Sequence, residues 1–171
     1  MVGKETIRPE LETTRASFHT LLDSLSNEDF HRQSKNPGWT NGEILFHMTL
    51  GFIIISMLAP LIRVFGRLPD RYSKLFAGFL NFGTVVFNWF NAFGARVGGR
   101  IYSRQRIGVQ FDRTYRRILK LLGSISQDEW QLGMYYPTEW DPLFSEYMTL
   151  DDLFHFPTNH YQYHLEQITH T

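Results

Sequence analysis

Two short segments of the chain carry a start signal for an α-helix. Thr40 and Glu43 have the spacing of a capping box, in which the threonine hydroxyl and the carboxylate each bind a backbone N–H of the first turn. Thr149 and Asp152 repeat this spacing near the C-terminus. Apolar residues follow both signals at helical spacing, and no segment shows the pattern of a strand-rich core. The sequence therefore predicts an all-α fold of antiparallel helices.

Apolar residues at three- and four-residue spacing predict four main helices. These cover about Thr6 to Leu25, Thr40 to Pro60, Gln105 to Leu122, and Thr149 to the end of the chain. A long stretch rich in Gly and Phe, at about 61–104, separates the second helix from the third, and we expect at least one helix in it, around Leu75 to Ala95. At 171 residues the chain is long enough for one domain, 1–171, in which 61–104 is an apolar helical insert.

The two halves of the chain resemble each other weakly. The segment from Leu21 to Phe30 parallels the segment from Leu121 to Trp130, and a loop and a capped helix with histidine follow each of them. Two helix-loop-helix halves would bring the second and fourth helices together. Chance convergence on helix-end chemistry is the alternative explanation for the similarity.

Charge and cysteine content limit the chemistry that this chain can support. Cysteine is absent, so a bound metal would need nitrogen and oxygen ligands, which suit zinc, nickel, iron(II) or manganese. From Arg63 to Arg117 there are eleven basic residues and only two acidic ones. This asymmetry indicates an anionic ligand, a membrane surface or a complementary subunit, although a solvated arginine face explains it equally well. The pattern matches no nucleic-acid-binding module, so no nucleic-acid partner is expected.

Two uncharged stretches, Ile44 to Ile62 and Leu75 to Ala95, are each about long enough to span a bilayer. The second carries Asn81, Thr84, Asn88 and Asn91, which predict one polar stripe along a helix. That pattern favours a helix buried in protein or lying at an interface, with a transmembrane hairpin as the alternative. The N-terminal segment is charged and amphipathic, unlike a secretory signal, so we expect a cytoplasmic protein, either free or peripheral to a membrane.

Three histidines form the strongest candidate site. His160 and His164 are four residues apart, so on a helix they lie one above the other on the same face. A catalytic metal usually takes three protein ligands and keeps one position open. His47 is the candidate third ligand, because it lies on a predicted helix with an apolar inward face. Ordinary hydrogen-bonded, partly buried histidines are the alternative.

The stretch Pro37-Gly-Trp-Thr-Asn-Gly-Glu-Ile-Leu-Phe-His47 resembles the entry to the second helix of the DinB/YfiT-like superfamily, and His160-Tyr-Gln-Tyr-His164-Leu-Glu-Gln-Ile168 resembles its final helix. The resemblance covers both ends of the chain and the helix order, but not the insert. It implies a four-helix bundle with up-down-down-up topology, a homodimer, and a divalent metal such as zinc, nickel or iron(II) held by His47, His160 and His164. Some relatives are transferases or isomerases that use a low-molecular-weight thiol, and others are metal-dependent hydrolases.

One departure from the family pattern is Pro157, three residues before His160, which predicts a kink or a restart of the final helix. In either case His160 and His164 stay in register with each other, and it is their register with His47 that depends on the kink. We expect lesser roles for the other histidines: His155 lies near the site or at the surface, while His19, His31 and His170 are incidental. Gly98-Gly99 indicates a hinge or close packing.

Other side chains around the predicted site have two interpretations each. Glu43 either orients His47 or serves only the capping box, and Gln167 either binds a metal-bound water or lies at the rim of the bundle. Tyr161 and Tyr163 either line the opening or pack. We expect the aromatic residues of the insert to enclose a bulky apolar substrate, namely Phe76, Phe79, Phe82, Phe87, Trp89, Phe90 and Phe93. Arg96, Arg100 and Arg104 would then meet an anionic group.

Three functions are consistent with the sequence. The first is a metal-dependent enzyme that acts on a hydrophobic small molecule, as a thiol-dependent transferase or isomerase or as a hydrolase. The second is a non-catalytic protein that binds a small molecule or a membrane, with a structural or vestigial metal. The third is an interaction module whose apolar insert is a dimer interface. The sequence identifies neither the substrate nor the catalytic residues.

Overall fold

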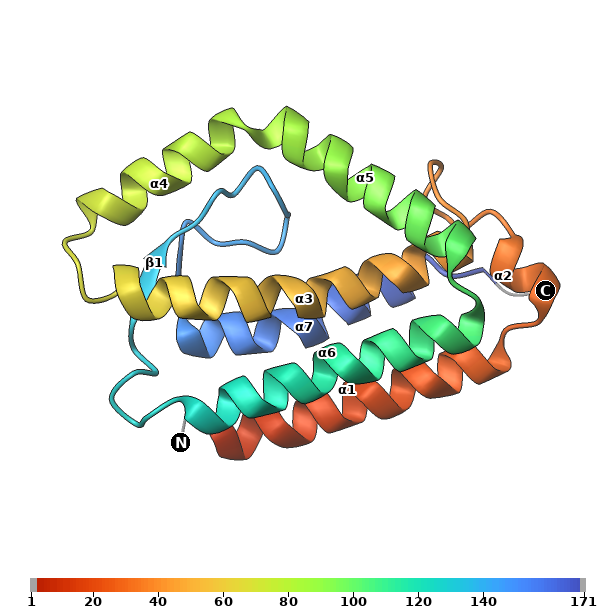
Figure 1. The fold of residues 1–171 in the computed structure, drawn as a ribbon, viewed down its shortest axis with the longest axis horizontal. Helices are drawn as coiled ribbons and strands as arrows, with labels where there is room; N and C mark the ends of the chain where they lie inside the picture. Colours follow the sequence, from red (N-terminus) through yellow and green to blue (C-terminus); the bar gives the residue numbers. More distant parts are fainter. Residues whose placement is uncertain (1–2, 170–171) are drawn as a thin grey trace.

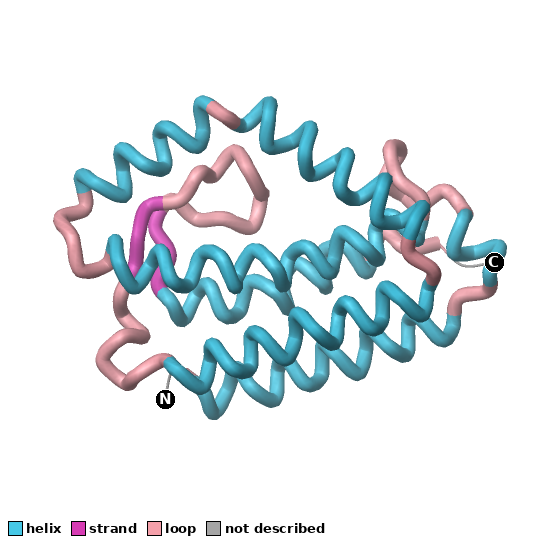
Figure 2. Tube along the Cα trace, viewed as in Figure 1, coloured by secondary structure: helices cyan, strands magenta, loops and turns pink. Residues whose placement is uncertain are grey.

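The structure is a computed structural model that describes residues 3–169. Its helices and strands, in chain order, are α1 (Lys4–Ser24), α2 (Asn27–His31), α3 (Asn41–Phe65), α4 (Arg71–Phe82), α5 (Thr84–Ile101), α6 (Arg104–Ser124), β1 (Gly133–Tyr135), β2 (Tyr147–Thr149) and α7 (Leu150–Leu165). Helices dominate the described chain, as predicted (Figure 2). His170 lies outside the described residues.

The four long helices α1, α3, α6 and α7 lie side by side, and α4 and α5 form an arch over α3 (Figure 1). α3 occupies the centre, because it packs against α5, α6 and α7. α1 packs against α6 and α7. The core between them is aromatic: the rings of Phe18 and Phe111 stack with centroids 3.9 Å apart, and Phe52 packs on Phe111 at 4.5 Å. These three side chains are fully buried.

Both predicted capping boxes are present at the starts of α3 and α7. The backbone N–H of Thr40 donates to Glu43 Oε2 over 2.8 Å, and that of Thr149 donates to Asp152 Oδ2 over 2.9 Å. These boxes fix the first turns of the two helices that carry the candidate metal ligands.

The two similar segments of the sequence also adopt similar local structures. After α1, the backbone N–H of Ser26 donates to the Asp29 carboxylate, and after α6 that of Ser126 donates to Glu129. Phe30 and Trp130, which end the two segments, are both buried. The weak sequence similarity therefore corresponds to two equivalent connections, each leading toward a helix that carries histidine.

The helices continue past Pro60, where the sequence predicted an end, and past Pro157, where it predicted a kink or a restart. α3 continues through Pro60 to Phe65, and α7 continues through Pro157 to Leu165 without a restart. Proline has a helical φ angle and removes only one backbone hydrogen bond, so burial of the following turn can offset the loss. Ile62 after Pro60 and Tyr161 after Pro157 are both fully or almost fully buried. The part of α7 that carries His160 and His164 therefore stays in one continuous helix with the turns before Pro157.

The insert is helical, as predicted, but its helix is interrupted. The expected helix around 75–95 is two helices, α4 and α5, which meet at Gly83, where the Thr84 hydroxyl donates to the Asn81 carbonyl over 2.7 Å. The predicted single polar stripe is therefore divided between them. Gly98 and Gly99 allow close packing of α5 on α3, because a Cβ at Gly98 would lie 2.2 Å from the ring of Phe46.

A short antiparallel ladder joins β1 and β2, in which Met134 pairs with Met148, and the sequence pattern did not predict it. The loop 136–146 that joins these strands lies between α3 and the arch of α4 and α5 (Figure 1). The ladder thus holds the two ends of a loop that extends beneath the insert.

Among the described helices, α3 is the one with the length and apolar composition of a membrane span. Half of its apolar window is buried inside the protein. Its core position, packed against α5, α6 and α7, accounts for the apolar composition of the first uncharged stretch.

Candidate metal centre

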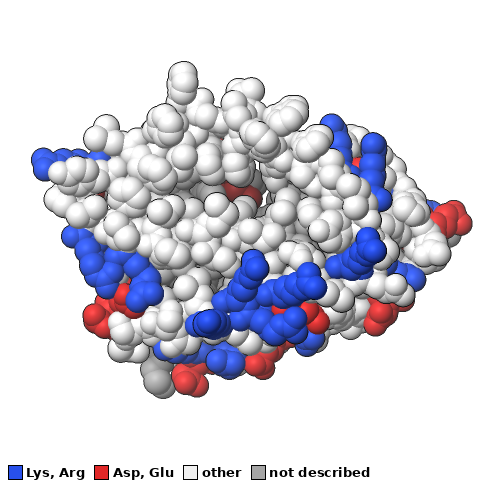
Figure 3. All heavy atoms as spheres, in the orientation of Figure 1, with Lys and Arg blue, Asp and Glu red and all other residues white. Residues whose placement is uncertain are grey.

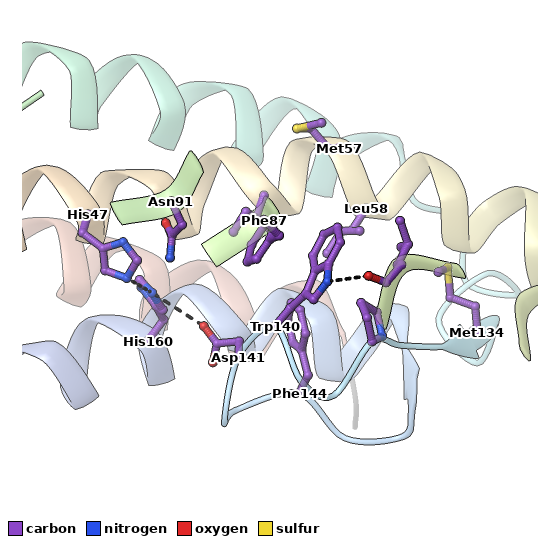
Figure 4. Close-up of a pocket in the computed structure, with 13 residues that line it drawn as sticks. His47, Met57, Leu58, Phe87, Asn91, Met134, Trp140, Asp141, Phe144 and His160 are labelled. Carbon is purple, nitrogen blue, oxygen red and sulfur yellow. Dashed lines mark hydrogen bonds and ion pairs between the residues drawn. The ribbon is translucent and has the colours of Figure 1, made fainter. Parts of the chain in front are cut away.

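The structure brings together the three histidines that the sequence singled out (Figure 4 shows two of them). His47 lies on α3, and His160 and His164 lie one turn apart on α7. One ring nitrogen of each lies within 4.8 Å of one ring nitrogen of the others, and Nε2 of His47 and Nε2 of His160 are 3.2 Å apart. All three side chains are buried. The cluster could hold one metal ion.

The spacing and chemistry of the cluster fit a divalent metal. Two nitrogen ligands of a tetrahedral zinc ion, each about 2.1 Å from the metal, are about 3.4 Å apart. The distance of 3.2 Å between the Nε2 atoms of His47 and His160 is close to that separation. Three neutral imidazoles suit zinc, nickel and iron(II).

Gln167 orients one of the three rings. Nδ1–H of His164 donates to Oε1 of Gln167 over 3.0 Å, which leaves the lone pair of Nε2 free for a metal. The sequence offered two interpretations of Gln167, contact with a metal-bound water or a place at the rim. The structure shows instead a residue that fixes the tautomer and orientation of a candidate ligand.

His47 and His160 differ from His164 in that their Nδ1 atoms are buried with no hydrogen-bond partner in the described part of the chain. Buried polar atoms without a partner are rare, and a functional role is one of the reasons for which proteins keep them. Gly51, one turn after His47 on α3, makes room for His160. A Cβ at Gly51 would lie 2.5 Å from Nδ1 of His160, so a larger residue there would displace the ring.

Burial keeps the cluster uncharged. It lowers the pKa of His47 to about 3, with a further contribution from His164, and Asn91 on α5 partly opposes the shift. Burial is also the main cause that lowers the pKa of His160 and of His164. Neutral imidazoles keep a lone pair available, so the cluster is ready to bind a cation near neutral pH without first losing protons.

A cavity of about 120 Å³ extends from the histidines beneath the arch. His47 and His160 stand at one end of it, and its walls are mostly apolar, including Leu58, Phe87 and Phe144 (Figure 4). Trp140 connects the loop 136–146 to both helices of the arch. Its Nε1–H donates to the Leu80 carbonyl over 3.0 Å, and its ring stacks on Phe87 at 3.8 Å.

Asp141 is the acidic residue among those that line the cavity, and sequence analysis did not find it. Its Oδ2 lies 4.0 Å from Nε2 of His160 (Figure 4). Burial raises the pKa of this carboxyl, and the backbone N–H of Leu143 partly lowers it. The only signal in the sequence was an acidic residue between Trp140 and Pro142, which predicts a turn without indicating what the turn faces.

His155, His19, Tyr161 and Tyr163 are not among the residues that line the cavity. His155 contacts Glu10 of α1, with 2.6 Å between Nδ1 and Oε2, and His19 contacts Asp112 at 2.9 Å. Tyr161 is fully buried, and its hydroxyl is 2.7 Å from that of Ser17, so it packs and does not line an opening. Tyr163 is half exposed and packs edge-on against His164.

The expectation that the aromatic residues of the insert enclose a substrate was wrong for most of them. Of the seven, Phe87 lines the cavity, and Phe76 stacks on Phe65. The other five are exposed on the outer side of the arch. The predicted arginine cluster is also divided: Arg104 begins α6 and donates to the Leu25 carbonyl, while Arg100 on α5 lies 3.6 Å from Glu43. Helical spacing alone could not show that a break separates the two helices.

Comparison with known families agrees with this architecture. The family model of the DinB superfamily matches residues 10–168. The chain belongs to this superfamily. The match runs from α1 to just beyond α7 and includes all three histidines. No curated protein and no solved structure matches the chain. Membership in the DinB superfamily confirms the resemblance and the all-α fold, while the up-down-down-up topology stays a prediction.

Proposed function

We propose that this DinB-superfamily protein is a metal-dependent enzyme that acts on a hydrophobic small molecule. One observation carries the proposal: two residues of the histidine cluster, His47 and His160, also form the end wall of an apolar cavity. Catalytic metal sites keep a coordination position open toward a substrate, whereas structural sites are closed by protein ligands. A three-histidine cluster that faces a cavity supports the catalytic arrangement.

When bound at the three imidazoles, a divalent metal supplies Lewis acidity, which lowers the pKa of a coordinated water or thiol. The chain has no cysteine, so sulfur chemistry would use an external low-molecular-weight thiol. The proposed reaction is therefore thiol-dependent transfer or isomerisation, or hydrolysis. Leu58, Phe87 and Phe144 would bind the apolar part of the substrate and exclude water.

Asp141 is proposed as the group that moves a proton. Asp141 lines the cavity, and its Oδ2 lies 4.0 Å from Nε2 of His160. In the described part of the chain, the Asp141 carboxylate forms no ion pair with Lys or Arg. A carboxylate in this position would accept the proton of an attacking water or thiol at Oδ2 and return it to the leaving group. Burial, which favours the protonated form, suits a carboxyl that has to hold a proton during turnover.

Elemental analysis of the purified protein is the first test. We expect about one equivalent of a divalent metal in the wild type and its loss in His160→Ala. His155→Ala is the matched control, because His155 lies on the same helix but contacts Glu10. It should keep the metal. No metal in the wild type, even after incubation with zinc or nickel, would overturn the enzyme proposal.

The alternative is a non-catalytic binding protein with a structural or vestigial metal, and the position of Asp141 is the observation that favours it. A carboxylate 4.0 Å from Nε2 of His160 is near enough to become a fourth ligand after a small movement. Cobalt(II) substitution separates the two functions. If the visible spectrum of the cobalt protein changes when azide or thiol is added, the metal has an open coordination position. If the spectrum does not respond to these ligands but differs between the wild type and Asp141→Asn, Asp141 is a fourth ligand and the site is closed.

Two further features of the proposal concern the whole protein. A cytoplasmic location agrees with reaction on small molecules and cellular thiols. A homodimer, as the family resemblance implies, would be seen as twice the monomer mass in light scattering after size-exclusion chromatography.

A further inference from the structure

The outer side of the arch carries an apolar surface that nothing in the described chain covers. We define this outer apolar face by Leu75, Phe79 and Phe82 of α4 and Trp89, Phe90 and Phe93 of α5. These six side chains are between 50% and 92% exposed. Their spacing places them on one side of each helix. Apolar patches of this kind mark a site that contacts a partner or a membrane.

Packing within the protein does not explain the outer apolar face, because the opposite side of α5 already serves the core. Phe87 and Asn91 line the cavity, and Ala95 and Gly98 are buried against α3. α5 thus carries apolar residues on both its inner and its outer side. A helix with apolar residues on opposite sides is normally buried on both of them. The outer side of α5 therefore fits an apolar environment outside the monomer.

The charges in the sequence around this face are mostly basic. No charged residue occurs from Leu75 to Ala95, and from Arg67 to Arg106 there are seven basic residues against the single acidic Asp70. Figure 3 shows an uncharged upper surface over the arch, with basic side chains toward both ends. Arg71 and Arg96, one beyond each end of the run, are exposed and form no ion pair in the described part of the chain.

We propose that the outer apolar face docks on the surface of an anionic lipid membrane. The apolar side chains would enter the boundary between headgroups and acyl chains, as in amphipathic helices that lie in the interface plane. Trp89 suits this boundary because its ring has an apolar body and a polar N–H. Arg71 and Arg96 would contact anionic headgroups on either side.

A second copy of the chain fits the face less well than a lipid surface. In a two-fold symmetric contact the same surface meets itself. Both ends of the outer apolar face are basic, so either orientation of the axis would bring like charges together. An anionic membrane, in contrast, complements both ends at once.

Docking would place the cavity close to the bilayer. Leu80, Phe87 and Asn91 lie on the inner side of the same two helices and line the cavity. A hydrophobic substrate dissolved in the membrane would then need to pass only the arch to reach the histidines. This last step rests on the proposed enzymatic function, whereas docking itself does not depend on the metal.

Cosedimentation with vesicles tests the proposal. We expect the protein to bind vesicles of phosphatidylcholine with phosphatidylglycerol at least about tenfold more strongly than phosphatidylcholine alone. Phe82→Ser with Phe90→Ser should weaken binding by at least about tenfold. Val64→Ser with Val109→Ser is the control, because these side chains are 58% and 51% exposed on α3 and α6.

The contribution of the basic residues is tested separately. Arg71→Gln with Arg96→Gln should also weaken binding. Arg113→Gln with Arg116→Gln, on α6, is the control and should leave binding unchanged.

A second measurement reports on the face directly. Lipids with brominated acyl chains should quench the fluorescence of Trp89, and Trp89→Phe should remove most of that quenching. Protein treated with a chelator should bind vesicles as the untreated protein does, so a failed metal site leaves this test intact. Absence of binding, equal binding to both vesicles, or a dimer that Phe82→Ser with Phe90→Ser dissociates would overturn the proposal.

Discussion

At the scale of single residues, the candidate site depends on how closely α7 approaches α3. His160 reaches its place because Gly51 has no side chain: a Cβ there would lie 2.5 Å from Nδ1. The sequence could indicate the three histidines, because their spacing and a family motif single them out. It could not indicate Gly51 or Asp141, since their importance comes from contacts between segments far apart in the chain.

Gly51→Ala is therefore expected to weaken metal binding by about ten- to a hundredfold, as changes beside metal ligands do. The added methyl group must displace His160, because the helix backbone cannot yield. Competition with a chromophoric chelator measures the affinity, and circular dichroism checks the fold. Gly123→Ala on α6 is the control, because a Cβ there has no neighbour within 4 Å. Equal affinities in the two variants would show that this contact does not hold the ring in place.

At the scale of elements, helix starts were predicted better than helix ends. Thr40 and Thr149 cap their helices through contacts within four residues, so the local sequence determines them. The continuations of α3 through Pro60 and of α7 through Pro157 depend on burial against other helices, which no local pattern contains. The break at Gly83 was missed because the apolar pattern continues on both sides of it.

Glu129 connects the end of α3 to the segment after α6, and its contribution to the stability of the fold should depend on pH. The carboxylate accepts from Arg63 at the end of α3, from Arg67 and from the backbone N–H of Ser126 after α6. These contacts lower the pKa of Glu129 from the usual 4.5 to about 2. Arg67 contributes most to this shift, followed by the backbone N–H of Ser126. Because the folded pKa is depressed, these contacts stabilise the protein fully above pH 4.5 and are lost as the pH falls toward 2.

Glu129→Gln is thus expected to lower the free energy of unfolding by about 1–3 kcal/mol at neutral pH. Urea unfolding at several pH values measures this, and the difference from wild type should shrink below pH 4.5. Glu28→Gln is the control, since the Glu28 carboxylate is exposed and its ion pair with Arg32 should contribute at most about 1 kcal/mol. A difference that stays constant with pH would show that the charge of Glu129 is not what matters.

At the scale of the whole molecule, the core and the metal centre are largely separate. The packed rings of Phe18, Phe52 and Phe111 join α1, α3 and α6 without any contribution from the three histidines of the metal centre. The apo protein is therefore expected to fold, unlike small domains that need a metal for stability. A ligand that binds only the folded state stabilises it by mass action, by about 2.7 kcal/mol at a hundred times its Kd.

Addition of zinc or nickel at that excess should accordingly raise the Tm of the apo protein by about 5–10 °C for a chain of this size. His160→Ala should show no such increase, while His155→Ala, whose ring contacts Glu10 of α1, should respond as the wild type does. Differential scanning calorimetry measures the Tm, and far-ultraviolet circular dichroism measures the helix content before the metal is added. Loss of helix in the apo protein would contradict the separation of core and site, because it would make the metal a structural element of the fold.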